Sequence, residues 1–446
     1  MSNRVKSRPK IGNAEFASRR KELMALMEPD SMAILPGSET QHRSNGVEYR
    51  FRQNSDLHYL TGFDEPDVVF VLLPGRQYGE AIVFCREREY DHERWHGSLT
   101  GPERAMQLYD MDDAFPIDDI DDILPGLMEG RSCIYFGMGA HPSFDAKIIS
   151  WSNTIAGDSR VGTEPPGDFI QLGQYLHELR LYKSPCEVEV LRCGAKISAA
   201  AHNKVMEMVS PGMMEYEVEA ELQYQFAING SRHPAYPSIV GGGSNGCIFH
   251  YIDNDSVLQA GDLVLIDAGG EYEYYASDIT RTLPVSGKFT EAQAKLYEIV
   301  LAAQLAAIDH VTPGNHWNQP HEAAIAVITH GLVEVGILSG DIDELIEREA
   351  YKKFCVHRTG HWLGLDVHDV GEYRVGGEWR VFERGMVTSI EPGIYIPEHM
   401  TDVPEEFCGI GIRIEDNVLV TKNGREVLTA SIPKTIEDIE RVMQGT

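Results

Sequence analysis

Five residues in the second half of the chain have the side-chain chemistry of a metal centre. They are four carboxylates and one imidazole, which lie among strand-forming residues: Asp267, Asp278, His361, Glu391 and Glu415. Burying a carboxylate costs free energy unless the group pairs with a cation or binds a metal ion. Several buried carboxylates from separate strands would therefore need positive charge close by.

Two explanations of these acids remain open on spacing alone. In the first, they form a structural ion-pair network with Arg281 and Arg413. In the second, they bind two divalent ions, which would balance four carboxylates and which bridging carboxylates hold about 3.5–4 Å apart. Oxygen-rich ligands favour a hard ion such as Mn(II) over Zn(II), although the order of affinities alone would not select Mn(II).

Short strands are expected to position the two aspartates. Asp267 ends the apolar run that begins at Leu263, and Asp278 follows eleven residues later. Gly269 and Gly270 lie between them and fit a hairpin turn. We therefore expect the two aspartates to lie side by side on neighbouring strands.

Helices should precede these strands. Ser184, Pro185 and Glu187 form a capping box with proline at the first helical position, so a helix begins there and a domain boundary falls at 181–185. Apolar residues at helical spacing extend this helix to Val209, and a second helix closes at Asn229.

The same order of elements returns about a hundred residues later. Helices are expected over 292–310 and around 324–332, and a strand-like segment with a histidine follows each helix pair, at 247–251 and 354–361. This weak repeat in element order predicts two similar halves that face each other across a cleft.

The first part of the chain has the pattern of an α/β domain. Short apolar runs at 31–35, 68–73 and 81–84 predict buried strands, and residues 17–27 predict a helix. A chain of 446 residues is long for one core, so two domains are expected.

Composition excludes several classes of partner. A formal net charge of −30 without a basic patch argues against nucleic acid. The apolar runs are far shorter than the roughly 20 residues that span a bilayer, so no membrane partner is expected. Seven scattered cysteines without a C-x-x-C pair and the lack of a secretory signal favour a reducing, cytoplasmic location. Arg4, Lys6, Arg8 and Lys10 are interpreted as a flexible basic arm rather than a transit peptide.

The whole chain resembles the aminopeptidase P family, which belongs with creatinase, prolidase and methionine aminopeptidase to the pita-bread superfamily. The motifs that carry the resemblance are residues 49–56 (YRFRQNSD), 59–63 (YLTGF), 178–180 (ELR), 183–185 (KSP), 245–251 (NGCIFHY), 361–371 (HWLGLDVHDVG) and the Glu391 and Glu415 segments. The resemblance implies an α+β chain: an aminopeptidase P/creatinase-like α/β N-terminal domain over 1–180, and a pita-bread catalytic domain over 181–446.

The resemblance also implies a role for each acid. Asp267 would bind one metal ion through both oxygens, and Asp278 and Glu415 would bridge two ions. His361 and Glu391 would complete the other site. All five ligand positions of the family pattern hold the expected residue type.

Further roles follow from the same match. His250 and His368 would contact the substrate and stabilise the tetrahedral intermediate, and Glu391 would also carry a proton to the leaving nitrogen. The proline pocket would involve His357, Tyr395 and Arg413, and Trp95 would contact substrate in a neighbouring subunit of a homo-oligomer, a dimer or tetramer. One departure is Arg358-Thr-Gly between His357 and His361, where the family often has small or apolar residues.

The function implied is a metal-dependent aminopeptidase that hydrolyses the bond between any N-terminal residue and a following proline in peptides. A hydroxide that bridges two divalent ions, most readily Mn(II), would be the nucleophile. Prolidase, which cuts only dipeptides, is the alternative, and a non-catalytic pita-bread binding protein is a further one. Creatinase and the binding protein are disfavoured because no ligand residue is lost.

Overall fold

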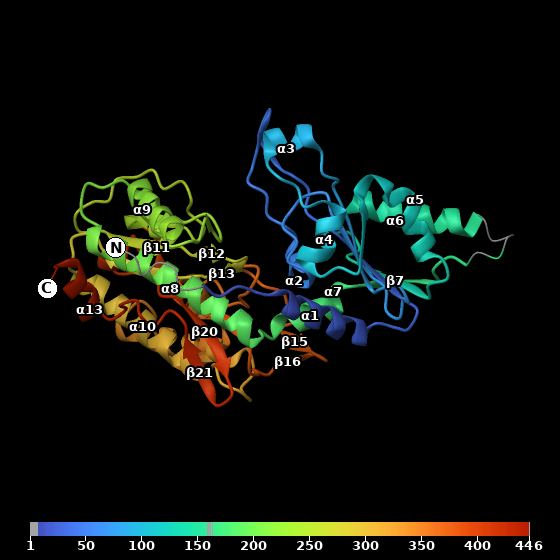
Figure 1. Cartoon of the computed structure of the whole chain (residues 1–446). Coiled ribbons are helices and arrows are strands. Elements are labelled where there is room, and N and C mark those ends of the chain that lie inside the picture. Colours follow the sequence, from blue (N-terminus) through green and yellow to red (C-terminus); the bar gives the residue numbers. More distant parts are fainter. Residues whose placement is uncertain (1–7, 158–161, 163, 446) are drawn as a thin grey trace. The chain divides into compact units, whose positions relative to one another are not determined.

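The computed structural model describes residues 8–157, 162 and 164–445. It divides into two compact units, drawn in Figure 1: Ile11–Arg180, and the chain from Leu181 onward together with Arg8–Lys10. Arg4 and Lys6 of the basic arm lie outside the described residues.

The first unit is built on a sheet of six strands in the order β6-β5-β4-β1-β7-β8. Strand β4 is antiparallel to β1 and β5, whereas β1–β7, β7–β8 and β5–β6 are parallel pairs. The strands are β1 (Met32–Pro36), β4 (Val69–Leu72), β5 (Ala81–Cys85), β6 (Asp113–Pro116), β7 (Cys133–Phe136) and β8 (Asp168–Gln171). The three strands expected from the apolar runs are β1, β4 and β5, so that prediction is confirmed.

Helices and a small hairpin complete this unit. They are α1 (Asn13–Leu26), α2 (Ser55–Thr61), α3 (Tyr90–His96), α4 (Gly101–Tyr109), α5 (Ile120–Met128), α6 (Pro142–Gly157), α7 (Gly173–Leu181), β2 (His42–Ser44) and β3 (Val47–Glu48). One apolar core lies between the sheet and helices α5 and α6, with Ile134, Leu124 and Trp151 among its buried members. Strand residues buried on both faces explain the continuous apolar runs in the sequence.

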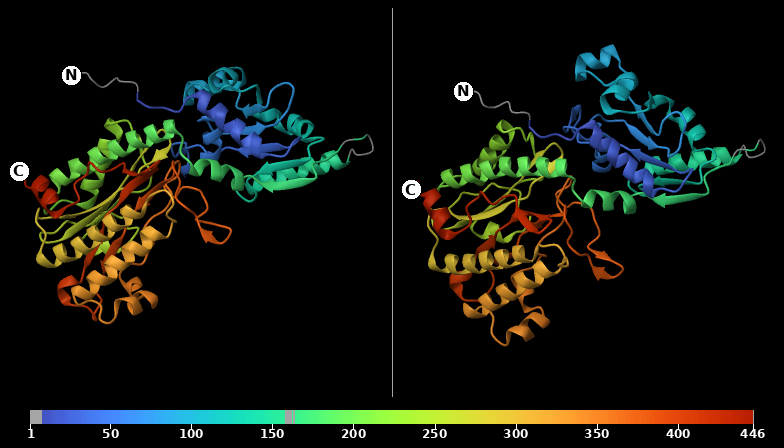
Figure 2. Two further views of the ribbon diagram at one scale, coloured as in Figure 1. Left: turned by 90° about the horizontal axis from the view of Figure 1, so that it is seen from below. Right: turned by 60° about the horizontal axis from the view of Figure 1, so that its bottom comes forward.

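The second unit begins with the expected capping box. Ser184 accepts a hydrogen bond from the Glu187 N–H at 3.5 Å, and Glu187 accepts one from the Ser184 N–H at 2.9 Å. The helices are α8 (Pro185–Met208), α9 (Glu215–Ile228), α10 (Glu291–His310), α11 (Gln319–Glu334), α12 (Ile342–Glu347) and α13 (Ile436–Met443). Figure 2 shows the green helix α8 on one side of the strands and the amber and orange helices α10 and α11 on the other.

Short antiparallel strands between these helices position the acids. They are β9 (His233–Pro234), β10 (Ile239–Gly242), β11 (Leu263–Asp267), β12 (Gly270–Tyr272), β13 (Tyr275–Ala276), β14 (Thr280–Pro284), β15 (Arg374–Val375), β16 (Glu378–Trp379), β17 (Val387–Ile390), β18 (Gly393–Ile396), β19 (Ile410–Arg413), β20 (Asp416–Thr421) and β21 (Gly424–Val427). Strands β10, β11 and β14 form one sheet, β17, β20 and β21 another, and β18 pairs with β19. Asp267 is the partner of Thr280 in the β11–β14 register.

Two local predictions were wrong. The turn between the aspartates lies at Glu273 and Tyr274, which both have positive φ, and not at the glycines. A Cβ on Gly269 would lie 1.7 Å from the Ser277 carbonyl oxygen, so this glycine serves close backbone packing instead. The segments 247–251 and 354–361 are turns and irregular chain rather than strands: the first is closed by local turn bonds, and the backbone of the second bonds at separate points to residues 389, 391 and 395 without forming a ladder.

The described part of the N-terminal arm packs against the second unit rather than extending freely. Lys10 forms an ion pair with Glu273 at 3.2 Å, and Tyr272 donates a hydrogen bond to the Pro9 carbonyl at 3.2 Å. Arg8 donates to the Asn229 carbonyl. Among the described residues, no helix combines the length and the apolar character that crossing a membrane requires.

Candidate active site

The four acids stand where strands of the second unit end or begin. Asp267 is the last residue of β11, Asp278 precedes β14, Glu391 follows β17 and Glu415 precedes β20. His361 lies in irregular chain that runs along β17, where its carbonyl accepts from the Ser389 N–H at 2.9 Å. Side chains at strand ends point out of the ladder, so these residues can converge while the backbone around them stays paired.

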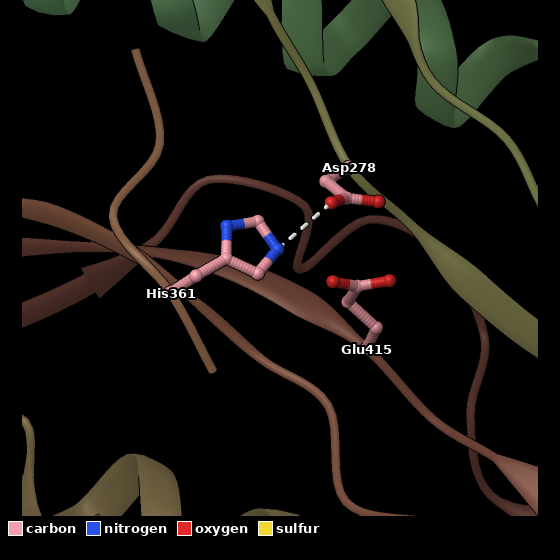
Figure 3. Close-up of side chains that lie close together, drawn as sticks. All are labelled: Asp278, His361 and Glu415. Carbon is pink, nitrogen blue, oxygen red and sulfur yellow. Dashed lines mark ion pairs between the residues drawn. The ribbon is translucent and has the colours of Figure 1, made fainter. Parts of the chain in front are cut away.

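The structure brings all five residues together. Asp278, His361 and Glu415 each offer a ligand atom, and these atoms lie within 4.8 Å of one another (Figure 3). His361 Nε2 lies 3.2 Å from Asp278 Oδ2 and 3.5 Å from Glu391 Oε1. Asp267 joins the group through Tyr236, whose hydroxyl lies 2.6 Å from both Asp267 Oδ1 and Asp278 Oδ1.

The charges of this cluster are not balanced by the protein. Burial raises the pKa of Asp267, raises that of Glu391 to about 7 and raises that of Glu415 well above its usual range. Burial alone would lower the pKa of His361, but the hydrogen bond to Asp278 and the negative charges of Glu391 and Asp278 outweigh it and raise the pKa to about 9. Arg413 adds one cation, which donates to Asp267 Oδ2 at 2.6 Å. Further positive charge would be needed to keep all four carboxylates ionised.

One carboxylate oxygen of the cluster, Oε1 of Glu415, lacks a hydrogen-bond donor or cation among the described residues. Glu415 is 1% exposed, and its Oε2 accepts from the Thr280 hydroxyl at 2.8 Å. Within the described part of the chain, Glu415 Oε1 is buried with no hydrogen-bond partner. Such an atom is costly unless something else compensates it, and a divalent ion would do so. The residues therefore fit a metal site with mainly oxygen ligands.

His361 is prepared to bind through one nitrogen. Its Nδ1 lies 2.9 Å from the Trp362 carbonyl, which can accept only an N–H and so fixes the proton on Nδ1. Nε2 faces Asp278 and Glu391 and donates its proton to Asp278 in the metal-free protein, and a metal ion bound there would replace that proton. This arrangement of a backbone carbonyl behind a histidine is common behind metal ligands.

Two residues that support the acids, Tyr236 and Asn417, were missed in the sequence. Tyr236 bonds the two aspartates, as described above. Asn417 accepts from the Asp278 N–H at 3.1 Å and donates to the Asp278 carbonyl, and Arg281 donates to the Glu415 carbonyl at 2.6 Å. Arg281 was expected to pair with the acids themselves, but its ion pair is with Asp416 at 2.7 Å. Neither Tyr236 nor Asn417 carries a charge or a motif that marks it.

The residues expected around proline form a connected group. The Tyr395 hydroxyl lies 2.7 Å from His357 Nε2 and accepts from Arg413 Nη1 at 2.8 Å. The ring of Phe249, which the sequence did not single out, lies with its centroid 4.7 Å from that of Tyr395 and 6.0 Å from that of His357. This group therefore offers an aromatic wall beside the acids.

Two further histidines lie at the margin of the site. The centroid of the His368 ring is 4.4 Å from that of the His361 ring. The residue is exposed, but its neighbours remove part of the solvent from the ring, and this partial desolvation together with the charge of His361 lowers its pKa. His250 is exposed in the turn that also carries Phe249. Trp95 belongs to α3 of the other unit, where it is 84% exposed.

Carboxylates at strand ends that converge on His361 are a donor set that fits a metal-dependent hydrolase. The chain belongs to metallopeptidase family M24: this family matches residues 189–422, and the aminopeptidase P N-terminal domain matches residues 16–135. The first match covers the acids of the second unit and the second covers most of the first unit.

Known proteins are similar over nearly the whole chain. A Xaa-Pro aminopeptidase of Haemophilus influenzae is 44% identical over 97% of this chain and 98% of its own length. The solved aminopeptidase PepP of Pseudomonas aeruginosa is 54% identical with a TM-score of 0.97, covering 98% of this chain and 99% of that one. Zinc-substituted Escherichia coli aminopeptidase P in complex with product is 42% identical with a TM-score of 0.95, over 98% and 99%. These likenesses confirm the α+β class with a pita-bread catalytic part.

Proposed function

We propose that this chain is a Xaa-Pro aminopeptidase, a metal-dependent hydrolase that removes an N-terminal residue ahead of proline. The observation that carries the proposal is the convergence of Asp267, Asp278, His361, Glu391 and Glu415 in a chain that matches Xaa-Pro aminopeptidases from end to end. A binding protein without catalysis would have no need to keep four carboxylates and an unpartnered Glu415 oxygen in one buried cluster.

The five residues would hold two divalent ions, with Asp278 and Glu415 shared and Mn(II) as the preferred ion. Bound ions supply a hydroxide nucleophile at neutral pH and polarise the substrate carbonyl. The ligand oxygens favour Mn(II) over softer ions, and a zinc-substituted relative shows that the choice needs a direct measurement.

The chain's own residues orient the substrate and move its protons. His368 lies against His361, and His250 follows Phe249 in the chain; both are exposed, and we assign them to donate hydrogen bonds to the developing oxyanion. Glu391, next to His361, carries a proton to the leaving nitrogen. That nitrogen belongs to proline and carries no N–H in the peptide bond, so the enzyme must recognise the proline ring by the shape of its pocket instead of by a hydrogen bond. His357, Tyr395 and Arg413 therefore form the pocket for the proline side, with Phe249 as its aromatic wall.

The test uses three peptides and one metal-free sample. The metal-loaded enzyme should release alanine from Ala-Pro-Ala, act more slowly on Ala-Pro and leave Ala-Ala-Ala intact. Exhaustive chelation, checked by elemental analysis, should abolish activity, and Mn(II) should restore it better than Zn(II). Activity on Ala-Pro alone would show a prolidase, and full activity without metal would refute the proposal.

The proposal extends to organisation and surroundings. Residues 1–180 and 181–446 are assigned as the N-terminal and catalytic domains, supported by the two family matches and by the division between Arg180 and Leu181. The enzyme acts on peptides as a homo-oligomer, a dimer or tetramer, in which Trp95 reaches the site of a neighbouring subunit. Seven free cysteines suit a cytoplasmic location.

A further inference from the structure

A carboxylate outside the metal cluster is as buried as any in the chain. Glu215 is 0% exposed and begins helix α9. Its Oε1 accepts from the Gly242 N–H at 2.7 Å and from Asn245 Nδ2 at 3.1 Å, and its Oε2 accepts from the Tyr251 hydroxyl at 2.8 Å and the Ser256 N–H at 2.9 Å. These four partners are all neutral, so hydrogen bonds compensate the burial of Glu215.

Among the side chains of this length, only a carboxylate can accept all four of these hydrogen bonds. Its two oxygens accept about four hydrogen bonds, whereas a glutamine side chain has one acceptor oxygen and an amide N–H₂ that would face two donors. Glu215 also lies in the first turn of a helix of 14 residues, where the helix dipole favours negative charge. The position therefore tolerates an unpaired anion that would be costly elsewhere in a core.

The donors come from both ends of one segment. Gly242 and Asn245 lie at its start, and Tyr251 and Ser256 at its end. A backbone bond from the Glu215 N–H to the Ser256 carbonyl, at 2.9 Å, adds a fifth connection. One side chain thus holds together the two ends of residues 242–256, most of which lie outside regular strands.

The segment between these ends carries active-site residues. Phe249 packs against Tyr395, with ring centroids 4.7 Å apart, and His250 follows it in the chain. His250 is exposed, so few local contacts restrict it, and its position depends on the backbone that carries it. Fixing the ends of the segment therefore fixes where the imidazole of His250 can lie.

We propose that Glu215 is a positioning residue of the enzyme, which acts on the reaction through His250 by holding residues 242–256 in place. The inference rests on the proposed function, because it assigns His250 to the substrate. Misplacing a catalytic group by about 1 Å can cost about 10²-fold in rate. We expect Glu215→Gln to lower kcat for Ala-Pro-Ala by about 10- to 100-fold, while the bound metal content stays that of the unmodified enzyme.

A matched control lies on the same helix. Glu221 accepts from Gln225 in the next turn, at 2.7 Å, and within the described part of the chain it makes no bond to residues 242–256, so Glu221→Gln changes the charge in the same way without touching the segment. Its kcat should equal that of the unmodified enzyme. The unmodified enzyme on Ala-Pro-Ala tests the proposed function separately, since its inactivity would refute that function rather than the role of Glu215.

A double-mutant cycle with His250→Ala decides between positioning and general stabilisation. If Glu215 acts through His250, adding Glu215→Gln to His250→Ala should lower kcat by less than about 3-fold further, because interacting sites are not additive. A full additional loss, or loss of metal from Glu215→Gln, would overturn the proposal. If Glu215→Gln does not fold, Tyr251→Phe removes one donor instead, and the same cycle with His250→Ala gives the same two readings.

Discussion

Four carboxylates lie in one site, and burial is the main factor that raises their pKa values. Asp278 is the exception among them: burial raises its pKa, but the hydrogen bond from His361 and the charge of His361 bring the pKa below its usual value. The pKa values of Asp267, Glu391 and Glu415 are all raised. A site with this balance gains most from divalent ions, and a variant that removes one of its carboxylates should lose those ions first.

The roles of Asp278 and His368 can be separated by measuring metal and rate together. Asp278→Asn removes the negative charge of a ligand that we propose is shared by two ions, so metal and activity should disappear together. The His368 ring packs edge-on against that of His361 but the residue is exposed, so His368→Ala should retain both ions while kcat falls by roughly 10²–10³-fold, as for the loss of one oxyanion donor. Elemental analysis and rates on Ala-Pro-Ala decide it. Metal loss from His368→Ala equal to that from Asp278→Asn would place His368 among the ligands.

The sequence could predict the charged members of this site and not its neutral ones. Asp267 and Glu415 are recognisable because an acid inside an apolar run demands an explanation. Tyr236 and Asn417 also bond to the acids, Tyr236 to their carboxylates and Asn417 to the backbone of Asp278. However, a tyrosine or an asparagine near a strand is ordinary in any protein. Their importance depends on which atoms they reach across the fold, and no local pattern records that.

A tight backbone contact sets the histidine segment against strand β17. The Glu391 N–H donates to the Thr359 carbonyl at 2.7 Å, and a Cβ on Gly360 would lie 2.1 Å from the Ser389 carbonyl oxygen. Moving residues 359–361 away from residues 389–391 would break the backbone hydrogen bonds that join them. Gly360 is therefore what allows His361 and Glu391 to approach each other.

Gly360→Ala should disrupt the site and the fold together. The added methyl group must push the segment away from β17, so we expect a loss of about 2 kcal/mol or more in the free energy of unfolding and weaker metal binding. Urea denaturation and metal titration measure the two effects. Gly194→Ala is the control, because a Cβ there meets its nearest neighbour, Tyr272 Cβ, at an ordinary 3.5 Å. Equal behaviour of the two variants would contradict this account.

Elements with strong local signals were predictable, and segments held by distant partners were not. The capping box at Ser184 fixed the start of α8, and the apolar runs gave β1, β4 and β5. Residues 354–361 contain strand-forming types, but their backbone bonds go to β17, β18 and neighbouring loops instead of a continuous ladder. Tertiary contacts overrode propensity there, as they commonly do for short segments.

Helix α8 contributes a buried histidine that should make stability depend on pH. His202 is 2% exposed, and its Nε2 lies 2.8 Å from the Ala268 carbonyl. Burial, assisted by the charge of Arg281, lowers its pKa, and the Ala268 carbonyl, Asp416 and Asp278 oppose this shift, which leaves the pKa at about 4. An unfolded histidine has a pKa of about 6.5. Between pH 6.5 and pH 4, His202 is therefore protonated in the unfolded chain and neutral in the folded chain.

Stability should therefore fall as the pH drops from about 6.5 to about 4, by about 2 kcal/mol at pH 5 from this group alone. His202→Gln can still donate to the Ala268 carbonyl and cannot titrate. Urea denaturation of the metal-free protein at pH 7 and pH 5 should show a smaller loss for this variant than for the unmodified chain, since the carboxylates contribute to both. An identical loss would mean that His202 is protonated in the folded state.

Each of the two units has its own apolar core, so each can be altered separately. The first is packed around Ile134 and Trp151, and the second includes a small cluster of Ile239, Leu265 and Tyr395 beside the active site. The exposed Trp95 contributes to neither core, and substituting it should leave both units folded. Exposed tryptophans are uncommon and often mark binding surfaces.

Subunit mixing can test whether Trp95 serves the active site of a neighbouring subunit. We expect Trp95→Ala to reduce kcat/KM for Ala-Pro-Ala by about 10-fold or more, the cost of losing one anchoring aromatic contact. His368→Ala subunits have an intact Trp95 and a poor active site, whereas Trp95→Ala subunits have the reverse. Co-expressed with different tags and purified through both, mixed oligomers would place an intact Trp95 beside an intact site.

Activity per active site that retains His368 should then rise above that of Trp95→Ala alone, because the neighbour supplies the missing side chain. If Trp95 contacts substrate within its own subunit, mixing cannot restore anything, and the activity should equal the average of the two variants. Oligomers tagged in two ways but built only from Trp95→Ala subunits control for the effect of tags. Light scattering at the assay concentration completes the test, since a fully active monomer would contradict a shared site directly.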